Sequence, residues 1–373
     1  MNRYPHSLGL FLPSLAGGGA ERVLVDLANH WAAEGRDVRL ICGAARGPYR
    51  EQIDSGVRIC DLGAERMALA VLPLRALLRR APTLPLLSSM SHANAAVLLA
   101  GRVLGRHHGT IVVQEASRFE LGRHGGTAAG RGLTRALVGR LYPLADHVTA
   151  VSEDVAEELA KLIGWPVERI SVIPNPIRLP LIQEKARAPC PHPWLADGKS
   201  KIILGVGRLS PEKDFATLIS ALALVREKTP ARLLILGEGP LEHELRRFAV
   251  ERNLDSVVDF VGFQANPLAF MSRADLVAVS SVAESFALVL VEAMAVGTNV
   301  VCVDCGAGPR TILADPVFGT LPKPGDCATL ARALLGRLSA PLPPARLQAV
   351  AAKFDIDPIA KRLLTLLSSA ERS

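Results

Sequence analysis

Short apolar strands alternate with helices along this chain, and the alternation runs through two series. The first series has strands predicted at 8–12, 38–42, 84–88, 110–113, 148–151 and 170–173, with helices at 20–33, 93–104 and 154–163. The second series has strands predicted at 202–206, 232–236, 257–261, 276–280 and 299–303, again with helices between them. Two neighbouring parallel strands need a crossover connection, so this rhythm is typical of a doubly wound parallel sheet. The sequence therefore predicts an α/β protein with two Rossmann-like domains.

A Pro-rich stretch without a regular pattern, from 174 to 200, separates the two series. We predict an N-terminal domain over residues 1–178, a linker over 179–200 and a C-terminal domain over 201–350. A chain of 373 residues is long enough to give each domain its own core. A second Pro-rich link at 341–344 allows a last helix, 356–371, to pack back on the N-terminal domain. Facing sheet edges of two such domains are expected to form a ligand-binding cleft.

The composition is that of a folded protein of a reducing compartment. Apolar residues make up 49% of the chain and the mean hydropathy is +0.25, which excludes a disordered chain. No apolar run approaches the roughly 18 residues of a membrane-spanning helix, and the first residues lack a signal-peptide core. Six cysteines in a chain of this length are expected to be small core residues rather than a disulfide framework. We therefore expect a cytoplasmic protein.

Positive charge is concentrated in the first half of the chain. The net charge is +7, yet the segment 62–145 alone has eleven arginines against three acidic residues. This segment predicts a cationic surface on the N-terminal domain. Because it has few aromatic residues to stack on bases, a nucleic-acid partner is not expected. Attraction to an anionic membrane face or to phosphates fits the charge, and a merely solvated arginine surface is the alternative.

Two glutamates, Glu284 and Glu292, lie in and beside a strongly apolar segment. Every side chain from Phe286 to Val296 except that of Glu292 is apolar, and Gly297 follows as a helix stop, so the segment predicts a mostly buried helix. A buried carboxylate without a partner costs several kcal/mol. The sequence thus predicts that Glu292 binds a ligand; a place on a thin exposed stripe of the helix or in a buried ion pair is the alternative.

A second candidate site follows the predicted strand 202–206. The run Gly205-Val-Gly207-Arg208-Leu-Ser210 begins like a dinucleotide-binding fingerprint, but Ser210 stands at the third glycine position and no acidic residue ends the next strand, so NAD is not expected. Arg208 and Lys213 instead place two cations beside free backbone amides at a helix start. That combination suits a diphosphate, while a capped helix with surface charges is the alternative.

Two further helix starts complete the predicted site. The loop Ala16–Arg22 has three consecutive glycines that allow close approach of a ligand, but no Gly-Lys-Ser/Thr follows, so it is not a P-loop; a flexible turn is the alternative. The backbone amides directly after Glu284, those of residues 286–288, form the third helix start. Three helix starts and two cations could neutralise a nucleotide diphosphate without a metal. The sequence shows no metal-binding constellation, and its one Asp-x-Asp, at 355–357, is predicted to be a helix cap.

Together these motifs resemble the retaining glycosyltransferases of family 4, or glycosyltransferase group 1, which have the GT-B fold. The resemblance covers nearly the whole chain. It rests on the Gly-Gly-Gly-Ala-Glu-Arg loop, Val151-Ser152-Glu153, Ile173-Pro174-Asn175-Pro176, Gly-Val-Gly-Arg-Leu with Lys213, Gly237-Glu-Gly239-Pro240 and two glutamates separated by seven residues.

The resemblance implies a role for each candidate residue. Gly207, Arg208 and Lys213 would contact the donor diphosphate, and Glu292 would bind the ribose hydroxyls. The donor sugar would be held by Glu284 and by the backbone amides of Phe286, Ala287 and Leu288. Gly18 and Gly19 would lie at the reacting region, and the terminal helix would cross back to the N-terminal domain.

The chain departs from the family pattern at several positions. Ser285 and Ala287 stand where the family commonly has glycine, and Asn299 where it commonly has proline; these changes could restrict the donor sugar. After the strand 110–113 many relatives have a histidine, whereas this chain has Gln114-Glu115, which makes Glu115 a candidate for contact with the sugar or the acceptor hydroxyl. His92 and Asn94 are the alternative for that contact.

The resemblance implies sugar transfer from a nucleotide diphosphate sugar, expected to be a UDP-sugar, to a hydroxyl of a glycan or lipid-linked saccharide, with retention at the anomeric carbon. No resident cofactor is expected. The arginine-rich domain suggests a peripheral position at the inner face of the cell membrane, in cell-surface polysaccharide or lipopolysaccharide biosynthesis. Alternatives are another GT-B enzyme, such as a nucleotide-sugar epimerase or a phosphorylase, and a catalytically silent GT-B binding subunit.

Overall fold

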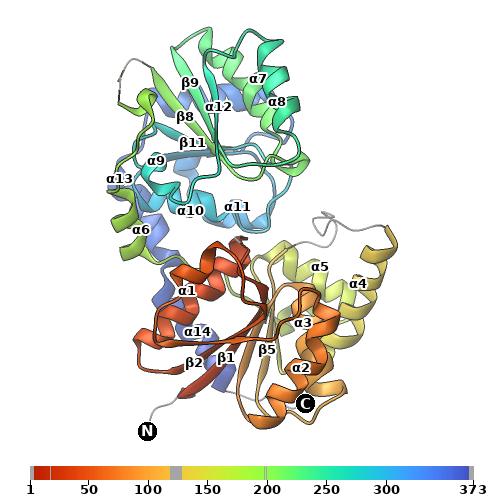
Figure 1. Cartoon of the computed structure of the whole chain (residues 1–373). Helices are drawn as coiled ribbons and strands as arrows, with labels where there is room; N and C mark the ends of the chain where they lie inside the picture. Colours follow the sequence, from red (N-terminus) through yellow and green to blue (C-terminus); the bar gives the residue numbers. More distant parts are fainter. Residues whose placement is uncertain (1–3, 17, 118–127, 197, 199, 369–373) are drawn as a thin grey trace. The chain divides into compact units, whose positions relative to one another are not determined.

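The computed structural model describes residues 4–16, 18–117, 128–196, 198 and 200–368, and the chain divides into two compact units (Figure 1). Unit 1 contains residues 1–176 and 356–373, and unit 2 contains residues 177–355. Gly17, Arg118, Arg123 and the end of the predicted terminal helix, 369–371, lie outside the described residues.

Unit 1 has a seven-stranded parallel sheet with the strand order β3-β2-β1-β4-β5-β6-β7. Its strands are β1 (Ser7–Ser14), β2 (Asp37–Ala44), β3 (Val57–Asp61), β4 (Leu86–Ser89), β5 (Ile111–Glu115), β6 (His147–Ala150) and β7 (Ile170–Val172). The central strands β1, β4 and β5 are buried almost without interruption, as expected for a parallel sheet covered by helices on both faces. The predicted doubly wound sheet is confirmed for this unit.

Two helices and one strand of unit 1 were not predicted by the strand–helix pattern. Its helices are α1 (Gly19–Ala33), α2 (Met67–Arg80), α3 (Ser91–Leu98), α4 (Ala128–Leu141), α5 (Glu153–Ile163) and α14 (Ile356–Ser368), and α3 continues as one π-helical turn, η2 (Leu99–Val103). The edge strand β3 and the helices α2 and α4 were not predicted. In α2 the internal Pro73 and apolar residues on all sides hide the helical period.

Unit 2 has a five-stranded parallel sheet with the order β10-β9-β8-β11-β12. Its strands are β8 (Lys201–Val206), β9 (Ala231–Leu236), β10 (Val258–Gly262), β11 (Leu276–Val279) and β12 (Asn299–Cys302). Its helices are α6 (Leu179–Ala186), α7 (Phe215–Arg226), α8 (Glu242–Val250), α9 (Leu268–Met271), α10 (Leu288–Ala295), α11 (Ala307–Ile312), α12 (Cys327–Ser339) and α13 (Pro344–Ala351). The second predicted parallel sheet is thus confirmed as well.

The boundary between the units differs from the prediction. Unit 2 begins at Ile177, so the stretch 179–200, predicted as a linker, belongs to unit 2 and begins with helix α6. An isolated parallel bridge joins Ile177 to Asp355 where the chain enters and leaves the unit. The terminal helix α14 belongs to unit 1, where it packs against α1 and where Arg362 donates a hydrogen bond to the backbone carbonyl of Val172 at 2.8 Å. Among the described helices, none is long and apolar enough to cross a membrane.

Each sheet has one point at which the strand order reverses. In unit 1 the neighbours of β1 are β2 and β4, and in unit 2 the neighbours of β8 are β9 and β11. Loops that leave the carboxyl ends of two such strands diverge to opposite faces of the sheet and leave a crevice in which doubly wound proteins bind ligands. In unit 2 these are the loops that carry the predicted cations and Glu284.

Candidate functional site

The loop that follows β8 is held in place by close backbone contacts with the loop that follows β9. The amide of Leu209 donates to the carbonyl of Glu238 at 3.0 Å, and the amide of Leu241 donates to the carbonyl of Leu209 at 3.0 Å. A Cβ atom on Gly237 would lie 2.0 Å from the carbonyl oxygen of Gly207, and one on Gly239 would lie 2.4 Å from that of Leu209. Only glycine fits at these two positions, so the backbone that carries Arg208 is firmly positioned.

One cation of this loop, Arg208, is available to a ligand, whereas most of the loop's amides are not. The prediction of free amides here is wrong for most of the loop, because the amides of Gly207, Leu209, Ser210 and Lys213 donate to carbonyls of the same unit. The start of α7 is capped by Asp214, whose carboxylate accepts a hydrogen bond from the amide of Thr217 at 3.2 Å. Arg208, by contrast, is exposed and has no hydrogen-bond or ion-pair partner among the described residues.

The loop that follows β11 brings Glu284 onto Lys213. The Lys213 Nζ atom donates to Glu284 Oε1 at 2.5 Å, and both side chains are largely buried. Ser281 donates its hydroxyl to the same carboxylate oxygen at 2.8 Å. Two backbone contacts fix this geometry: the Ser280 hydroxyl donates to the carbonyl of Lys213 at 2.9 Å, and the amide of Val282 donates to the carbonyl of Glu212 at 2.9 Å.

This arrangement joins two predicted site residues that lie 71 positions apart in the chain. The buried ion pair neutralises both charges without a ligand, and Ser281 supplies a further donor. Ligand sites of doubly wound proteins usually lie at the strand-order reversal and contain a few polar groups, as this cluster does. The contribution of Ser280 and Ser281 had no sequence signal, since a serine pair after a strand is common in turns.

Helix α10 begins directly after this loop and carries Glu292. The prediction of a buried helix here is confirmed, since only its first residues, Leu288 and Val289, are partly exposed and Glu292 itself is buried with 5% of its surface accessible. The first amides of a helix have no intrahelical acceptor. The amides of residues 286–288 have no acceptor in the described part of the chain, so this predicted helix start remains open to a ligand.

The backbone before α10 is under steric constraint. Ala287 adopts the left-handed conformation, with φ 61° and ψ 61°, where the family resemblance expects glycine. Phe286 is buried and packs edge-on against Phe354, with ring centroids 5.5 Å apart. A Cβ atom on Gly308, at the start of α11, would lie 2.2 Å from the carbonyl oxygen of Ser285. Gly308 therefore supports this turn, a role that no sequence signal indicated.

In unit 1 the loop after β1 leads into α1 at the strand-order reversal. Gly18 is the residue before α1, and its carbonyl accepts a hydrogen bond from the amide of Arg22 at 3.1 Å. The carbonyl of Leu15, earlier in the loop, accepts from the amide of Tyr49 at 3.3 Å. Gly19 starts α1 and is exposed, like Gly18. The ligand contact assigned to Gly18 and Gly19 stays a prediction.

Glu115 ends β5 and lies in a buried polar network. Its carboxylate accepts a hydrogen bond from the Tyr142 hydroxyl at 2.7 Å and one from the Ser91 hydroxyl at 3.0 Å, and it is fully buried. Asn94 donates to the Tyr142 oxygen at 2.8 Å. The structure therefore shows Glu115 bound to protein groups rather than exposed to an acceptor, and it places Asn94, one of the alternatives, in the same network. His92, the other alternative, is exposed at the start of α3.

Burial raises the pKa of Glu115 from its ordinary 4.5 to about 7, against the opposing effect of the hydrogen bonds from Tyr142 and Ser91. The folded protein thus holds this proton more tightly than the unfolded chain does. The stabilisation that this proton provides is complete below pH 4.5 and is lost as the pH rises through about 7.

The substitution Glu115→Gln should remove this pH dependence, since the amide stays neutral and keeps the shape of the acid. We expect the free energy of unfolding of the wild type to fall between pH 5 and pH 8 by up to about 3 kcal/mol more than that of the variant. Urea unfolding at four pH values measures the difference. Glu65→Gln, at an exposed glutamate of the same unit, is the control. Parallel pH profiles of wild type and Glu115→Gln would contradict the prediction.

Comparison with known proteins agrees with the two-unit architecture. Residues 17–179 match the model of the family described as Glycosyltransferase Family 4, and residues 191–354 match that of Glycosyl transferases group 1. A curated relative, the N-acetylgalactosamine-N,N'-diacetylbacillosaminyl-diphospho-undecaprenol 4-alpha-N-acetylgalactosaminyltransferase of Campylobacter jejuni, is 37% identical over 50% of this chain and 48% of its own length. The chain spans about half the length of the first curated relatives it matches.

Two other similarities extend over most of the chain. The lipopolysaccharide core biosynthesis glycosyltransferase LpsD of Rhizobium meliloti is 25% identical over 85% of this chain and 84% of its own length. The crystal structure of Anabaena HepE in complex with UDP-glucose superimposes with a TM-score of 0.79 at 22% identity, covering 97% of this chain and all of HepE. At that identity the superposition establishes the fold.

Proposed function

The chain belongs to the group 1, family 4 glycosyltransferases of GT-B fold, and we propose that it transfers a sugar from a nucleotide diphosphate sugar to a hydroxyl of a glycan or lipid-linked saccharide. The observation that carries the proposal is the cluster of Lys213, Glu284 and Ser281 at the strand-order reversal of unit 2, on the loops that also carry Arg208, whose side chain has no partner in the described part of the chain. Two cations and hydroxyl- and carboxylate-bearing side chains are the kinds of group that a sugar diphosphate requires.

The donor is proposed to be a UDP-sugar. HepE, which shares the fold of this chain over nearly its whole length, binds UDP-glucose. In this chain Arg208 and Lys213 would bind the diphosphate, and Glu292 would accept hydrogen bonds from the ribose hydroxyls. Glu284 and the open amides of residues 286–288 would hold the sugar. A carboxylate that accepts hydrogen bonds from two hydroxyl groups is a strong and directional partner for a ribose.

The chemistry assigned to these residues is charge stabilisation and positioning. As the bond between the sugar and the diphosphate breaks, negative charge develops on the leaving phosphate oxygens, and the guanidinium of Arg208 and the ammonium of Lys213 would stabilise it. The two cations could supply this without a metal ion. We propose that the acceptor hydroxyl attacks from the face that the diphosphate leaves, and that a phosphate oxygen takes its proton, which gives retention at the anomeric carbon.

The acceptor is proposed to be lipid-linked or part of a cell-surface glycan, and the enzyme to work at the inner face of the cell membrane. The names of the Campylobacter jejuni and Rhizobium meliloti relatives support this class of acceptor: the first is an N-acetylgalactosaminyltransferase named for a saccharide on diphospho-undecaprenol, and the second a lipopolysaccharide core biosynthesis glycosyltransferase. The arginine surplus of unit 1 supports contact with an anionic membrane, because clustered arginines are attracted to such a surface.

Donor binding and transfer can be tested with one panel of nucleotide sugars. We expect a UDP-sugar to raise the midpoint of thermal unfolding and to release UDP when a glycan or lipid-linked acceptor is added. Glu292→Ala should bind and turn over this donor far less. The anomeric configuration of the product, determined by NMR, tests retention.

Each rival function has its own outcome in this test. Conversion of the donor without an acceptor would indicate an epimerase, and a requirement for inorganic phosphate a phosphorylase. Donor binding without any turnover would indicate a silent binding subunit. A Glu292→Ala variant that binds and turns over the donor like the wild type would contradict the assigned site.

A further inference from the structure

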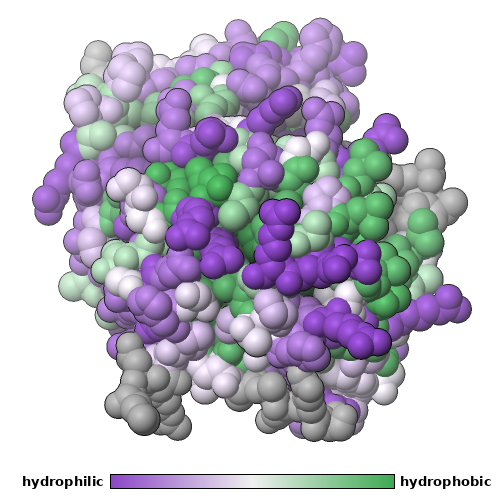
Figure 2. Space-filling model, turned by 60° about the horizontal axis from the view of Figure 1, so that its bottom comes forward, coloured by the Kyte–Doolittle hydropathy of each residue, from purple (hydrophilic) through white to green (hydrophobic). Residues whose placement is uncertain are grey.

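The outer face of helix α2 is apolar although it faces solvent. The inner face packs into unit 1 through Ala70, Val71, Leu74 and Leu78. On the outer face Leu69 and Leu72 each expose 66% of their surface, one helical turn apart. A surface helix of a soluble domain normally carries charged residues on this face. Figure 2 shows hydrophobic side chains among long hydrophilic ones on the right of the view, the side on which Figure 1 draws α2, α3 and α4.

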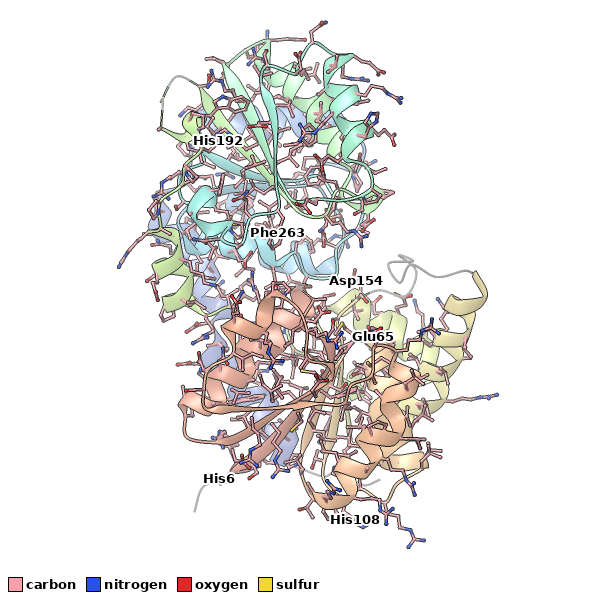
Figure 3. All side chains as sticks on the ribbon, in the orientation of Figure 1. His6, Glu65, His108, Asp154, His192 and Phe263 are labelled. Atoms are coloured by element: carbon pink, nitrogen blue, oxygen red, sulfur yellow. The ribbon has the colours of Figure 1, made fainter. Side chains whose placement is uncertain are left out.

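Exposed arginines lie at both ends of this apolar face. Arg66 precedes α2, and Arg79 and Arg80 end it; none of the three has an ion-pair partner among the described residues. Acidic residues are nearly absent, since the segment 62–117 contains only Glu65 and the buried Glu115. Glu65 is exposed, and its carboxylate lies 3.7 Å from the guanidinium of Arg46. Figure 3 draws Glu65 and His108 at opposite edges of unit 1.

A second exposed apolar group lies beside the carboxyl end of α2. The π-helical turn η2 packs against α2, and its last residue Val103 and the next residue Leu104 each expose about half of their surface. The chain then turns tightly at Gly105, where a Cβ atom would lie 2.4 Å from the carbonyl oxygen of Ala100. Next comes Arg106, which is exposed and has no partner among the described residues.

The tip of η2 borders a polar hollow of about 440 Å³ between residues 101–108 and the loop 143–146. Its lining includes Arg102, Arg106, His107 and His108. The side chain of Arg102 is already engaged by Asp146 and by backbone carbonyls, so Arg106 is the available cation of this hollow. The tip therefore combines two exposed apolar side chains, an arginine that none of the described residues pairs with, and a space large enough for a phosphate group.

We propose that these two parts, the outer face of α2 and the η2 tip, form one docking surface for an anionic lipid bilayer. We name it the α2–η2 surface, with Leu69, Leu72, Val103 and Leu104 as its apolar residues and Arg66, Arg79, Arg80 and Arg106 as its cations. The leucines and valine enter the interface between headgroups and acyl chains, while the arginines reach the lipid phosphates. This inference rests on the proposed lipid-linked acceptor and specifies where the protein meets the membrane that contains it.

Charge favours a bilayer over a protein partner at this surface. A protein that covered it would need an acidic rim around an apolar centre and would have to match arginines spread over both ends of a helix. A bilayer with anionic lipids offers negative headgroups and an apolar interior at every lateral position. Each arginine near such a surface contributes a similar amount to the free energy of binding. The exposed apolar residues then distinguish docking from simple charge attraction.

Sedimentation of the full chain with vesicles tests the proposal. The vesicles contain phosphatidylcholine and roughly 30% of the anionic lipid phosphatidylglycerol. They should sediment the wild type at low salt, and about 0.5 M salt should release much of the bound protein. The variant Leu69→Glu/Leu72→Glu should bind these vesicles at least about 10-fold more weakly. The variant Arg79→Glu/Arg80→Glu/Arg106→Glu should lose about 100-fold or more.

The control variant Val167→Glu/Val250→Glu adds the same two charges at exposed valines outside the surface and should bind vesicles like the wild type. Thermal stabilisation by the UDP-sugar is measured on every variant and should be unchanged, which separates membrane docking from the donor site. Equal vesicle binding of all variants, or concentration-dependent self-association lost in Leu69→Glu/Leu72→Glu without vesicle binding, would overturn the docking surface. Vesicle binding as expected without any donor stabilisation would leave the docking surface in place and refute the proposed function instead.

Discussion

Replacing Lys213 by methionine is expected to lower sugar transfer at least about 100-fold and to destabilise unit 2 by about 3 kcal/mol. The two losses have different causes. Transfer falls because a cation proposed to stabilise the leaving diphosphate is gone. Stability falls because the carboxylate of Glu284, largely buried and 2.5 Å from the Lys213 ammonium, loses its counter-charge. UDP release with a saturating acceptor measures the first effect, and urea unfolding measures the second.

A double variant, Lys213→Met/Glu284→Gln, separates these two causes. Replacing both members of a buried ion pair by neutral groups of similar size is often close to neutral for stability. The glutamine can still accept the hydrogen bond that Ser281 donates to Glu284 Oε1. We therefore expect most of the lost stability to return while transfer remains at the level of the single variant or below. Recovery of transfer in the double variant would show that the pair is structural only, and a single variant as active as the wild type would remove Lys213 from the site.

The second large effect is expected for Gly308→Ala, one methyl group added at the start of α11. The new Cβ atom would lie 2.2 Å from the carbonyl oxygen of Ser285 and 2.6 Å from the Cα atom of Phe286. Both are backbone atoms, so no side-chain rotation can relieve the contact, and the turn before α10 must shift. Because this turn positions the open amides of residues 286–288, a displacement of about 1 Å should lower transfer about 100-fold. The overpacking should cost about 2 kcal/mol of stability.

Gly336→Ala is the matched control, since a Cβ atom on this glycine of α12 would meet nothing within 4 Å. Alanine is the better helix former, so this variant should be as stable as the wild type or slightly more so and should keep full transfer. Donor binding by thermal shift and transfer by UDP release are compared for the two variants. A Gly308→Ala protein that binds and transfers like Gly336→Ala would show that the turn before α10 does not form part of the donor site.

The sequence predicted both sheets well because parallel strands buried on both faces are nearly continuous apolar runs. In unit 1 it missed β3, α2 and α4 for separate reasons. The strand β3 (Val57–Asp61) is at a sheet edge and has few buried residues. Helix α2 is apolar on its outer face as well, so it lacks the period of an amphipathic helix. Helix α4 contains three glycines, and glycine is a poor helix former, so its sequence does not predict a helix.

The candidate site was predicted in its residues but not in its contacts. Arg208, Lys213, Glu284 and Glu292 were named from charge, spacing and family resemblance. The pattern did not show that the amides of Gly207 and Leu209 are already used, because their acceptors, the carbonyls of Leu236 and Glu238, belong to β9 and the loop after it. Nor did it show that Glu115 is enclosed by Tyr142 and Ser91, since these lie on different helical segments of unit 1.

The sequence by itself determined the class of fold, the family and the residue types available for a sugar diphosphate, because these depend on local periodicity and on motifs of a few residues. Only the tertiary structure decided which of these groups meet. Lys213 and Glu284 pair because β8 and β11 are neighbours in the sheet although two strands separate them in the chain. Contacts of this kind are set by strand order and by the packing of loops at the sheet edge, which short stretches of sequence do not encode.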